Sequence, residues 1–372
     1  MNVPLPSQHD SLVAAERVYV ILVNWNGWRD TIECLESVFR LEDVTYTVVV
    51  CDNGSADGSL EKIKGWAKGD VVAAARNPSM AALTSPAVPK PISCVELGMS
   101  SAAASGAAPR LVLIQTGANL GFAAANNIGM RYALAQPDCR YLWLLNNDTV
   151  VAPDSLRRLL DRMNLDAGIG ICGSTLLFYD RVKDGARSVQ ACGGSRYNPW
   201  TSRGGHIAAG YDQEHLPTQA WVEHRLRYIV GASMLVSRRF VESVGLMNEQ
   251  YFLYFEEIDW ATRARGLFRL GYAPLSLVFH KTGATIGTAA RPIFQSEMAD
   301  YWGTRNRIVF TRKYFLYALP SVYFFVLCSA LLRLVNGRIA NFRAVVAGAL
   351  LLSAPALTDI PPKATERGIA GD

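Results

Sequence analysis

The sequence has few of the residues from which metal-binding and disulfide-stabilised domains are built. Among 372 residues it contains five histidines and seven cysteines, and no two cysteines are spaced as Cys-x-x-Cys. A zinc knuckle needs closely spaced pairs of ligands, and a disulfide framework normally uses an even number of cysteines. We therefore exclude both classes and expect reduced, mostly buried thiols. The cysteines are Cys34, Cys51, Cys94, Cys139, Cys172, Cys192 and Cys328.

Basic runs and targeting segments are also missing. The formal net charge is +5, and no basic run with interleaved aromatic residues suggests a nucleic-acid groove, so we expect no nucleic-acid partner. A phosphate-bearing substrate, an anionic membrane surface or simple solubility would each suit so small a surplus. Residues 1–17 carry acidic residues and no apolar core. They are unlike a secretory signal, so we expect a cytoplasmic protein.

Apolar runs in the first half of the chain are each followed by a polar loop and an amphipathic segment. Strands are predicted at residues 18–23, 46–51, 111–115 and 141–145 because these runs are short, apolar and rich in β-branched residues. Repeated strand-loop-helix units predict an α/β fold with a parallel sheet and with polar side chains at the carboxyl ends of its strands.

Two segments interrupt this pattern. Residues 69–110 are rich in Ala, Ser and Pro with little periodicity, which is typical of a long surface insertion. After a strand predicted at 169–172, residues 193–205 are Gly-rich and aromatic, and we interpret them as substrate-facing loops. Further strands are predicted at 227–230 and 273–279.

The C-terminal part contains an uncharged apolar stretch, Tyr314–Leu332, flanked by basic residues. At about 1.5 Å per residue it could barely cross a hydrocarbon core of roughly 30 Å, and Pro320 interrupts it. We favour a membrane-surface or re-entrant helical hairpin over a buried core helix. The sequence is therefore divided into a catalytic-type domain, residues 1–312, and an apolar, membrane-associated helical tail, residues 313–372.

A carboxylate follows the predicted strand at 141–145. The run Asn146-Asn147-Asp148 sets Asp148 at the mouth of a parallel sheet, where a carboxylate can bind a divalent cation already held by phosphates. The alternative is a helix-capping turn ahead of Pro153, since Asn and Asp favour such positions.

Three carboxylates, Glu256, Glu257 and Asp259, follow a run of aromatic residues at 251–255. Like charges beside apolar rings raise the proton affinity of one carboxylate, as a general base for an alcohol requires. The alternative is the acidic first turn of a helix, which the helix dipole favours. His280 follows the strand predicted at 273–279 and would lie at the same sheet edge, although a single histidine there is more often structural.

These segments, in this order, resemble the family 2 glycosyltransferases, and in particular their rhamnosyltransferase-like branch. The resemblance covers about residues 18–311, apart from the insertion. Besides the acidic elements, its motifs are Val23-Asn24-Trp25-Asn26 after the first strand, Val50-Cys51-Asp52-Asn53-Gly54-Ser55-Ala56-Asp57-Gly58-Ser59 after the second, and Asn119-Leu120-Gly121-Phe122-Ala123-Ala124-Ala125-Asn126-Asn127 after the third.

The resemblance implies a GT-A fold, in which a Rossmann-like, mostly parallel central sheet is flanked by helices and the donor nucleotide lies across the strand ends. Asp52 would contact the base or ribose, and Asn119 and Gly121 would lie near the diphosphate. The residues assigned to the donor in this way are Asn24, Trp25, Asn26, Asp52, Asn53, Asn119, Gly121, Asn126 and Asn147.

The resemblance also implies the metal and the base. Asp148 matches the last position of the family's Asp-x-Asp motif, with Asn146 at the first position, and His280 matches a histidine that completes the metal shell in some members. The implied cofactor is Mg²⁺ or Mn²⁺. Glu257 matches the catalytic base; Glu256 and Asp259 would shape its field, or one of them would itself be the base.

The implied reaction is an inverting transfer of a sugar, best matched by rhamnose from dTDP-rhamnose, to a saccharide or lipid-linked saccharide in cell-envelope polysaccharide synthesis. The implied place is the inner membrane surface, with the protein peripheral or monotopic. A non-catalytic nucleotide-sugar-binding scaffold of an envelope assembly complex is the alternative that Asn146 keeps open. A dinucleotide-dependent oxidoreductase would need Gly-x-Gly-x-x-Gly after the first strand, and that motif is absent.

Overall fold

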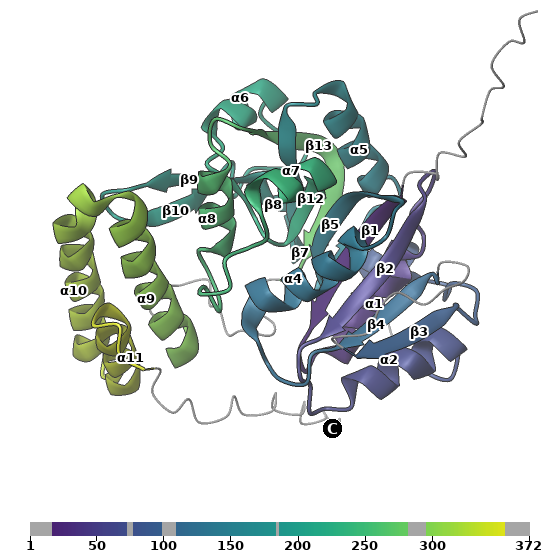
Figure 1. Cartoon of the computed structure of the whole chain (residues 1–372), viewed down its shortest axis with the longest axis horizontal. Coiled ribbons are helices and arrows are strands. Elements are labelled where there is room, and N and C mark those ends of the chain that lie inside the picture. The colour runs from purple at the N-terminus through teal and green to yellow at the C-terminus, as the bar shows by residue number, and fades with distance from the viewer. Residues whose placement is uncertain (1–16, 73–76, 99–108, 184–185, 282–294, 354–372) are drawn as a thin grey trace, which may run out of the picture.

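The computed structural model describes residues 17–72, 77–98, 109–183, 186–281 and 295–353, and these form a large mixed sheet, a small sheet and a C-terminal group of helices (Figure 1). The large sheet has ten strands in the order β3-β4-β2-β1-β5-β12-β7-β13-β6, with β8 paired to β7. The small sheet has the order β10-β9-β11.

The first half of the large sheet is parallel and carries the predicted strand-loop-helix units. Its strands are β1 (Arg17–Asn24), β2 (Tyr46–Asp52), β4 (Leu111–Gln115) and β5 (Cys139–Asn146), and their helices are α1 (Trp28–Val38), α2 (Ser59–Lys68), α4 (Gly121–Leu134) and α5 (Ser155–Leu165). The four predicted strands are confirmed within two residues at each end. Because β1 lies between β2 and β5, the chain reverses direction across the sheet at β1, which is where open α/β sheets form a ligand crevice.

Alternate residues of β1 point to opposite faces of the sheet, and each face has its own core. Val20 and Leu22 pack with the apolar sides of α1, α2 and α5, whereas Tyr19 and Ile21 pack with α4 and with helices of the second half. All these side chains are buried. The continuous apolar run of β1 is therefore that of a strand covered on both faces.

The second half of the sheet adds antiparallel pairs. Its strands are β6 (Thr149–Val151), β7 (Ile169–Lys183), β8 (Ala186–Cys192), β12 (Ser233–Ser237) and β13 (Arg269–His280), and its helices are α6 (Gln219–Arg225), α7 (Arg238–Val244) and α8 (Glu256–Arg263). β12 runs antiparallel to both β5 and β7, while β13 is parallel to β7. The expected α/β fold, with a mostly parallel central sheet flanked by helices, is confirmed.

The segment predicted as a surface insertion is more integrated than expected in its described parts, 69–72, 77–98 and 109–110. It contains η1 (Pro78–Met80), α3 (Ala81–Thr84) and β3 (Cys94–Gly98), and β3 pairs in parallel with β4 as the edge strand. Glu36, buried on α1, accepts a hydrogen bond from the Val88 amide at 2.8 Å and lies 3.3 Å from the Lys90 ammonium. These long-range contacts hold the segment against α1, and local periodicity could not show them.

The prediction of loops at 193–205 was wrong for most of that range. β9 (Gly194–Asn198) and β10 (Arg203–His206) form antiparallel strands, and β9 also pairs with β11 (Tyr228–Ile229). Gly194 suits this pairing because a side chain there would collide with the Tyr228 carbonyl. Its presence reflects close strand packing, which resembles a loop signal in the sequence.

The C-terminal part is a group of helices, α9 (Glu297–Tyr314), α10 (Leu319–Val335) and α11 (Ile339–Ala349), with a short η3 (Leu316–Ala318) before α10. Ile308 of α9 packs with Val322, Val326 and Ala330 of α10 and with Val345 of α11. α9 runs through residues 312 and 313, where the sequence analysis divides the chain. It joins this group to α8 through the buried cluster of Tyr251, Ile258 and Phe310.

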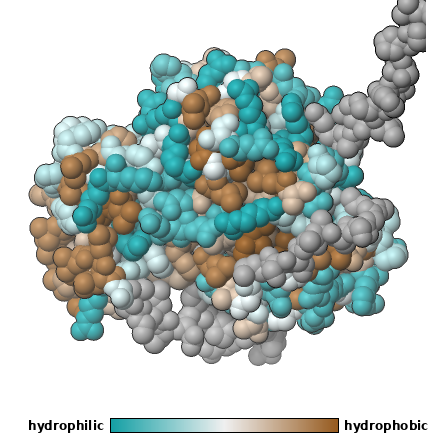
Figure 2. All heavy atoms as spheres, viewed as in Figure 1, coloured by the Kyte–Doolittle hydropathy of each residue, from teal (hydrophilic) through white to brown (hydrophobic). Residues whose placement is uncertain are grey.

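The outer face of α10 is apolar and exposed. Figure 2 shows hydrophobic residues gathered over α10 and α11 at one end of the molecule, and Phe324, Leu327 and Leu331 are 60%, 57% and 48% exposed. Among the described residues one helical stretch, Leu316–Val335, is long and apolar enough to cross a membrane, and 28% of it is buried. A buried core helix would have most of this surface covered.

All seven cysteines are free, and five of them are buried, as expected. Cys94 and Cys328 are exposed.

Candidate active site

The loops at the carboxyl ends of β1 and β2 are joined by side-chain hydrogen bonds. The Asn24 amide donates to Asp52 Oδ1 at 2.7 Å and to Ser55 Oγ at 3.1 Å, and Asn24 Oδ1 accepts from Thr31 at 2.7 Å. Asn26, in a left-handed conformation with φ of 49°, accepts from the Ala56 amide through its side chain at 2.8 Å. Asn24 and Asp52 are buried, so both hold the rim of the sheet together.

A second set of contacts joins β2 to the loop before α4. The Asn53 amide donates to Asn119 Oδ1 at 2.9 Å, and Asn53 Oδ1 accepts from the Leu120 backbone at 2.9 Å. Asn119 Oδ1 also accepts from the Gly121 amide at 3.0 Å. Gly121 has φ of +82°, and a side chain there would collide with the Phe252 carbonyl, so the segment before α8 can approach only a glycine at this point.

These loops line a pocket of about 240 Å³ at the sheet edge, which we call the rim pocket. It brings together seven of the predicted donor or metal residues, which lie at or after the ends of β1, β2, β4, β5 and β13. They are Trp25, Asn53, Asn119, Gly121, Asn147, Asp148 and His280. Segments more than 200 residues apart in the chain therefore converge here, as expected for the carboxyl ends of parallel strands.

The remaining predicted donor residues lie behind the rim pocket. Asn24, Asn26 and Asp52 make the contacts described above and do not line it. Asn126 is buried in α4, where its amide donates to the Phe122 carbonyl one turn earlier at 2.9 Å.

Asp148 and His280 form a pair on the floor of the rim pocket. Asp148 Oδ1 lies 3.2 Å from His280 Nε2, and His280 Nδ1 lies 2.9 Å from Gln190 Oε1. Burial would raise the pKa of the Asp148 carboxyl, but His280 and Lys281 hold it below its ordinary value. A hydrogen-bond acceptor on the far nitrogen is how proteins orient a metal-binding imidazole.

This donor set fits a divalent cation that is shared with a bound diphosphate. One carboxylate and one imidazole supply two ligands, and Asn146 lies 3.4 Å from His280 Nε2. Within the described residues no group of three or more His, Cys, Asp or Glu could hold a metal ion. Hard cations such as Mg²⁺ commonly take one or two protein ligands and complete their shell with phosphate oxygens and water.

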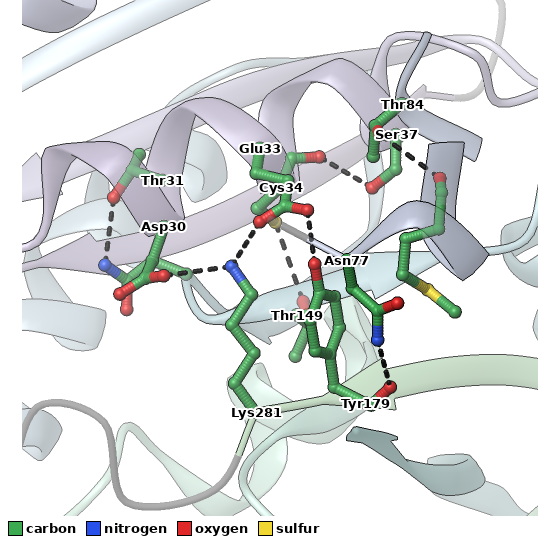
Figure 3. Close-up of polar contacts among 12 residues, drawn as sticks. Asp30, Thr31, Glu33, Cys34, Ser37, Asn77, Thr84, Thr149, Tyr179 and Lys281 are labelled. Carbon is green, nitrogen blue, oxygen red and sulfur yellow. Dashed lines mark hydrogen bonds and ion pairs between the residues drawn. The ribbon is translucent and has the colours of Figure 1, made fainter. Parts of the chain in front are cut away.

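A buried ion network fixes the end of β13 beside Asp148 (Figure 3). The Lys281 ammonium donates to Asp30 Oδ1 at 2.9 Å and to Glu33 Oε2 at 2.6 Å, and both carboxylates belong to α1. The Tyr179 hydroxyl donates to Glu33 Oε1 at 2.5 Å, and the Lys281 amide donates to the Asp148 carbonyl at 3.0 Å. Burial would lower the pKa of Lys281, but the two carboxylates raise it.

A larger cavity of about 950 Å³, which we call the helical cavity, lies between the small sheet, α8, α9 and α10. Tyr254 lines both this cavity and the rim pocket. Tyr254 and Phe255 have φ of 68° and 73°, a left-handed conformation that is costly for aromatic residues. The Asn306 amide of α9 holds the turn by donating to the Leu253 and Tyr254 carbonyls at 2.8 and 3.1 Å.

The structure places the three acidic candidates differently. Glu257 lines the helical cavity and accepts from the Gly231 amide through Oε1 at 3.2 Å. A Cβ at position 231 would lie 2.5 Å from that oxygen, so glycine permits the contact. Burial raises the pKa of Glu257. A carboxylate with raised proton affinity and an open path to a cavity has the properties of a general base.

Glu256 and Asp259 are turned away from the helical cavity. Glu256 is 2% exposed, and its Oε2 has no partner among the described residues. Burial, with the neighbouring Glu257, raises the pKa of Glu256 well above its ordinary value. Asp259 is fully buried and paired, accepting from Arg263 at 2.8 Å, Lys313 at 3.0 Å and Tyr314 at 2.7 Å.

Several residues that line or support the two hollows are not indicated by motifs in the sequence. Tyr254 stands within an aromatic run, and Lys281 directly follows His280. Arg203 and Arg307, which line the helical cavity, lie on elements whose packing the sequence does not show. For Lys281 the available signal was a pair of carboxylates, Asp30 and Glu33, spaced three apart on a predicted helix face.

The sequence model of the family described as Glycosyl transferase family 2 matches residues 100–241. The matched segment contains β4, α4, β5 and the turn that carries Asp148.

Two curated relatives match parts of the chain. Over 155 residues it is 25% identical to the low-salt glycan biosynthesis hexosyltransferase Agl10 of Haloferax volcanii, covering 41% of this chain and 45% of the relative. Over 198 residues it is 28% identical to an N-acetylglucosaminyl-diphospho-decaprenol L-rhamnosyltransferase of Mycobacterium tuberculosis, covering 48% of this chain and 61% of the relative. The chain thus spans about half the length of these curated relatives.

Solved structures of similar shape are distant. The mannosyltransferase PcManGT from Pyrobaculum calidifontis, in complex with GDP-Man and Mn²⁺, has a TM-score of 0.48 and 14% identity, over 90% of this chain and 87% of that chain. S. aureus TarS 1–349 in complex with UDP has a TM-score of 0.42 and 10% identity, over 79% of this chain and 64% of that chain.

Proposed function

Because the chain carries a glycosyl transferase family 2 domain, we propose that it is an inverting glycosyltransferase that moves a sugar from a nucleotide diphosphate donor to an acceptor hydroxyl. The proposal depends on one observation, that the rim pocket and the helical cavity adjoin each other at Tyr254. The rim pocket holds Asp148 and His280, the helical cavity holds Glu257, and Tyr254 lines both. A donor in the first and an acceptor in the second would meet at Tyr254.

In this proposal the rim pocket binds the donor. Trp25, Asn53, Asn119 and Gly121 line it. Gly121 also lets the Phe252 carbonyl come close to the start of α4. Asp148 and His280 would hold Mg²⁺ or Mn²⁺, which supplies charge neutralisation for the leaving diphosphate. The Lys281 network keeps both ligands in place from behind.

Glu257 would act as the base from the helical cavity. Its carboxylate removes the proton of the acceptor hydroxyl while that oxygen attacks the anomeric carbon on the face opposite the leaving group, so one displacement inverts the configuration. Gly231 orients the carboxylate through its amide. Glu256 has the greater proton affinity and no access to the helical cavity, and Asp259 is engaged by cations, so neither suits this role.

The identities of the donor sugar and of the acceptor are proposed from one of the relatives. The rhamnosyltransferase relative favours dTDP-rhamnose as donor and a lipid-linked saccharide as acceptor, which would place the reaction in cell-envelope polysaccharide synthesis at the cytoplasmic face of the inner membrane. The exposed apolar face of α10, with Arg312 and Lys313 nearby in the chain, supports attachment to that surface.

The reaction is tested by measuring release of nucleoside diphosphate from UDP-, GDP- and dTDP-sugars with Mg²⁺ or Mn²⁺, for the wild type and for Asp148→Ala. Release from one donor that is lost in Asp148→Ala supports a metal-assisted transferase and identifies the sugar. Binding of a nucleotide sugar without release from any donor would contradict the transferase and favour the non-catalytic scaffold.

Membrane attachment is tested by flotation with vesicles that contain anionic lipid. Leu327→Glu and Phe324→Glu place charges on the exposed face of α10, so we expect both variants to stay with the unbound protein. Leu165→Glu, at an 83% exposed leucine at the end of α5, is the matched control and should float like the wild type. Equal flotation of all the variants would contradict attachment through α10.

A further inference from the structure

The helical cavity contains an arginine with one buried N–H group that the described residues leave unpaired. Arg307 of α9 lines the cavity, and its Nε is shut off from solvent without a hydrogen-bond partner among the described residues. A guanidinium carries five N–H donors, and leaving them buried and unpaired is costly. Burial and the neighbouring Arg203 lower the pKa of Arg307 to about 10. Among the described residues, therefore, no acceptor pairs with this Nε.

The two carboxylates that line the helical cavity, Asp300 and Glu257, already have partners. Asp300, which also lines the helical cavity, binds the Arg333 guanidinium through both oxygens and accepts from the Asn341 amide at 2.8 Å. Glu257 is held by the Gly231 amide. Of the carboxylates that line the cavity in the described part of the chain, neither is left for Arg307, so an anionic ligand would supply its missing partner.

The surroundings of Arg307 show what kind of ligand this is. Arg203 of β10 also lines the cavity, and its guanidinium carbon lies 5.8 Å from the centre of the Phe325 ring on α10. The wall formed by α10 is apolar at Cys328 and Leu332, and Leu332 is 50% exposed, so this wall continues into the outer face of the helix. Two guanidinium groups beside an apolar exit suit a phosphate that carries a hydrocarbon chain.

We propose that Arg307 and Arg203 bind a phosphate group of the acceptor, whose apolar chain leaves the helical cavity along α10. This inference rests on the proposed transferase function and specifies its acceptor: a saccharide joined through phosphate to a lipid. The phosphate anchors the acceptor so that the sugar hydroxyl reaches Glu257, which lines the same cavity. Arg307 would thus select acceptors by their charge, separately from the donor.

The test is binding of farnesyl phosphate and farnesol to the full chain, followed by intrinsic tryptophan fluorescence. EDTA is present so that no divalent cation can bridge the phosphate to Asp148. We expect the wild type to bind farnesyl phosphate about tenfold more tightly than farnesol, and Arg307→Gln to lose this preference, because charge-assisted bonds to phosphate are among the stronger hydrogen bonds.

Arg196→Gln is the matched control. Arg196 is exposed on β9 next to Tyr197, which lines the helical cavity, so strand alternation directs Arg196 to the other face of the small sheet. This variant should keep the wild-type preference. An unchanged preference in Arg307→Gln, or equal loss in Arg196→Gln, would overturn the assignment. So would inorganic phosphate that displaces farnesyl phosphate at equal concentration, since the site would then bind phosphate alone.

Thermal unfolding without ligand separates a binding role from a structural one. Arg307→Gln removes an unsatisfied buried charge, so its melting temperature should equal or exceed that of the wild type. A lower melting temperature would make Arg307 a structural residue. If the wild type releases no nucleoside diphosphate from any donor but shows Arg307-dependent binding of farnesyl phosphate, the transferase proposal fails while the phosphate site stands.

Discussion

The rim pocket and the helical cavity differ in how their buried polar atoms are satisfied. At and around the rim pocket, Asn24, Asp52 and Asn53 each make two or more hydrogen bonds within the protein. Four buried side-chain polar atoms have no partner among the described residues, and two of them, the Tyr254 hydroxyl and Arg307 Nε, belong to residues that line the helical cavity. The other two, Glu256 Oε2 and Thr262 Oγ1, belong to α8.

This contrast shows that the two sides are prepared to different degrees. The loops of the rim pocket hold one another in place, so a donor would meet a preformed surface. In the helical cavity, Arg307 and Tyr254 keep polar groups whose burial costs stability until a ligand pairs with them. Removing a hydrogen-bonded polar group at the rim pocket should therefore destabilise the protein. Removing an unpaired polar group that lines the helical cavity should affect function more than folding.

The largest effect is expected for Glu257→Gln. Loss of a general base lowers turnover by about 10²–10⁴-fold, while folding and donor binding should be retained because Glu257 lies in the helical cavity. The measurement is kcat and donor KM for sugar transfer. Glu249→Gln is the control, because Glu249 lies on the segment before α8 but contacts Asn127 and Arg131. Wild-type turnover of Glu257→Gln would assign the base to another group.

Lys281→Met tests the donor side. It removes the cation bound by Asp30 and Glu33, and breaking a buried ion cluster costs about 3–5 kcal/mol. We expect a matching loss in urea unfolding and weaker retention of Mn²⁺. Lys64→Met is the control, since Lys64 pairs with Glu61 and Glu96 at the surface and such pairs contribute about 0–1 kcal/mol. Equal losses of stability in Lys281→Met and Lys64→Met would contradict the buried network's role in holding the donor side together.

Two substitutions in α8 should have opposite signs. Glu256→Gln removes a buried carboxyl whose pKa is raised, so at pH 7 it should stabilise the protein by about 1–3 kcal/mol. Asp259→Asn, three residues along the same helix, weakens contacts to Arg263, Lys313 and Tyr314 and should destabilise it. Chemical denaturation of both variants gives the comparison, and stabilisation by Asp259→Asn would contradict it.

The stabilisation from Glu256→Gln should depend on pH. A carboxyl with a raised pKa in the folded state binds its proton more tightly there than in the unfolded chain, so its ionisation destabilises the fold as the pH rises above the unfolded pKa of about 4.3. The difference between wild type and variant should thus be small near pH 4 and grow toward pH 7. A difference independent of pH would mean that burial of the charge is not its cause.

The parallel half of the fold could be read from the sequence because its signals are local. Continuous apolar runs define β1, β2, β4 and β5, and the Asn and Asp residues that follow them lie at one edge as expected. The small sheet was missed because β9 and β10 are short, and their glycines, which allow close pairing, resemble loop glycines. Strand β3 was not predicted because it is a short edge strand inside an Ala-, Ser- and Pro-rich segment that has little periodicity.

The candidate site was predictable to the same extent. Asp148, His280 and Glu257 were predicted from their positions after strands or after an aromatic run and from the family resemblance. The structure brings the first two together and places the third in the adjoining cavity. The partners of Lys281 could not be found, because Asp30 is 251 residues away in the chain. Arg307 was equally invisible, since an arginine in a predicted helix looks solvent-exposed until the neighbouring elements are packed.

The contacts of Asp259 have a practical consequence for protein engineering. Two of its partners, Lys313 and Tyr314, are the last residues of α9, just before the apolar helices α10 and α11. A chain shortened to obtain a more tractable sample would lose both if it were cut at residue 312, and α8, which carries Glu257, would lose part of its anchoring. A shortened chain should therefore keep Tyr314 and end after it. Where the aim is only to reduce aggregation, replacing the exposed leucines of α10 by polar residues is the smaller change.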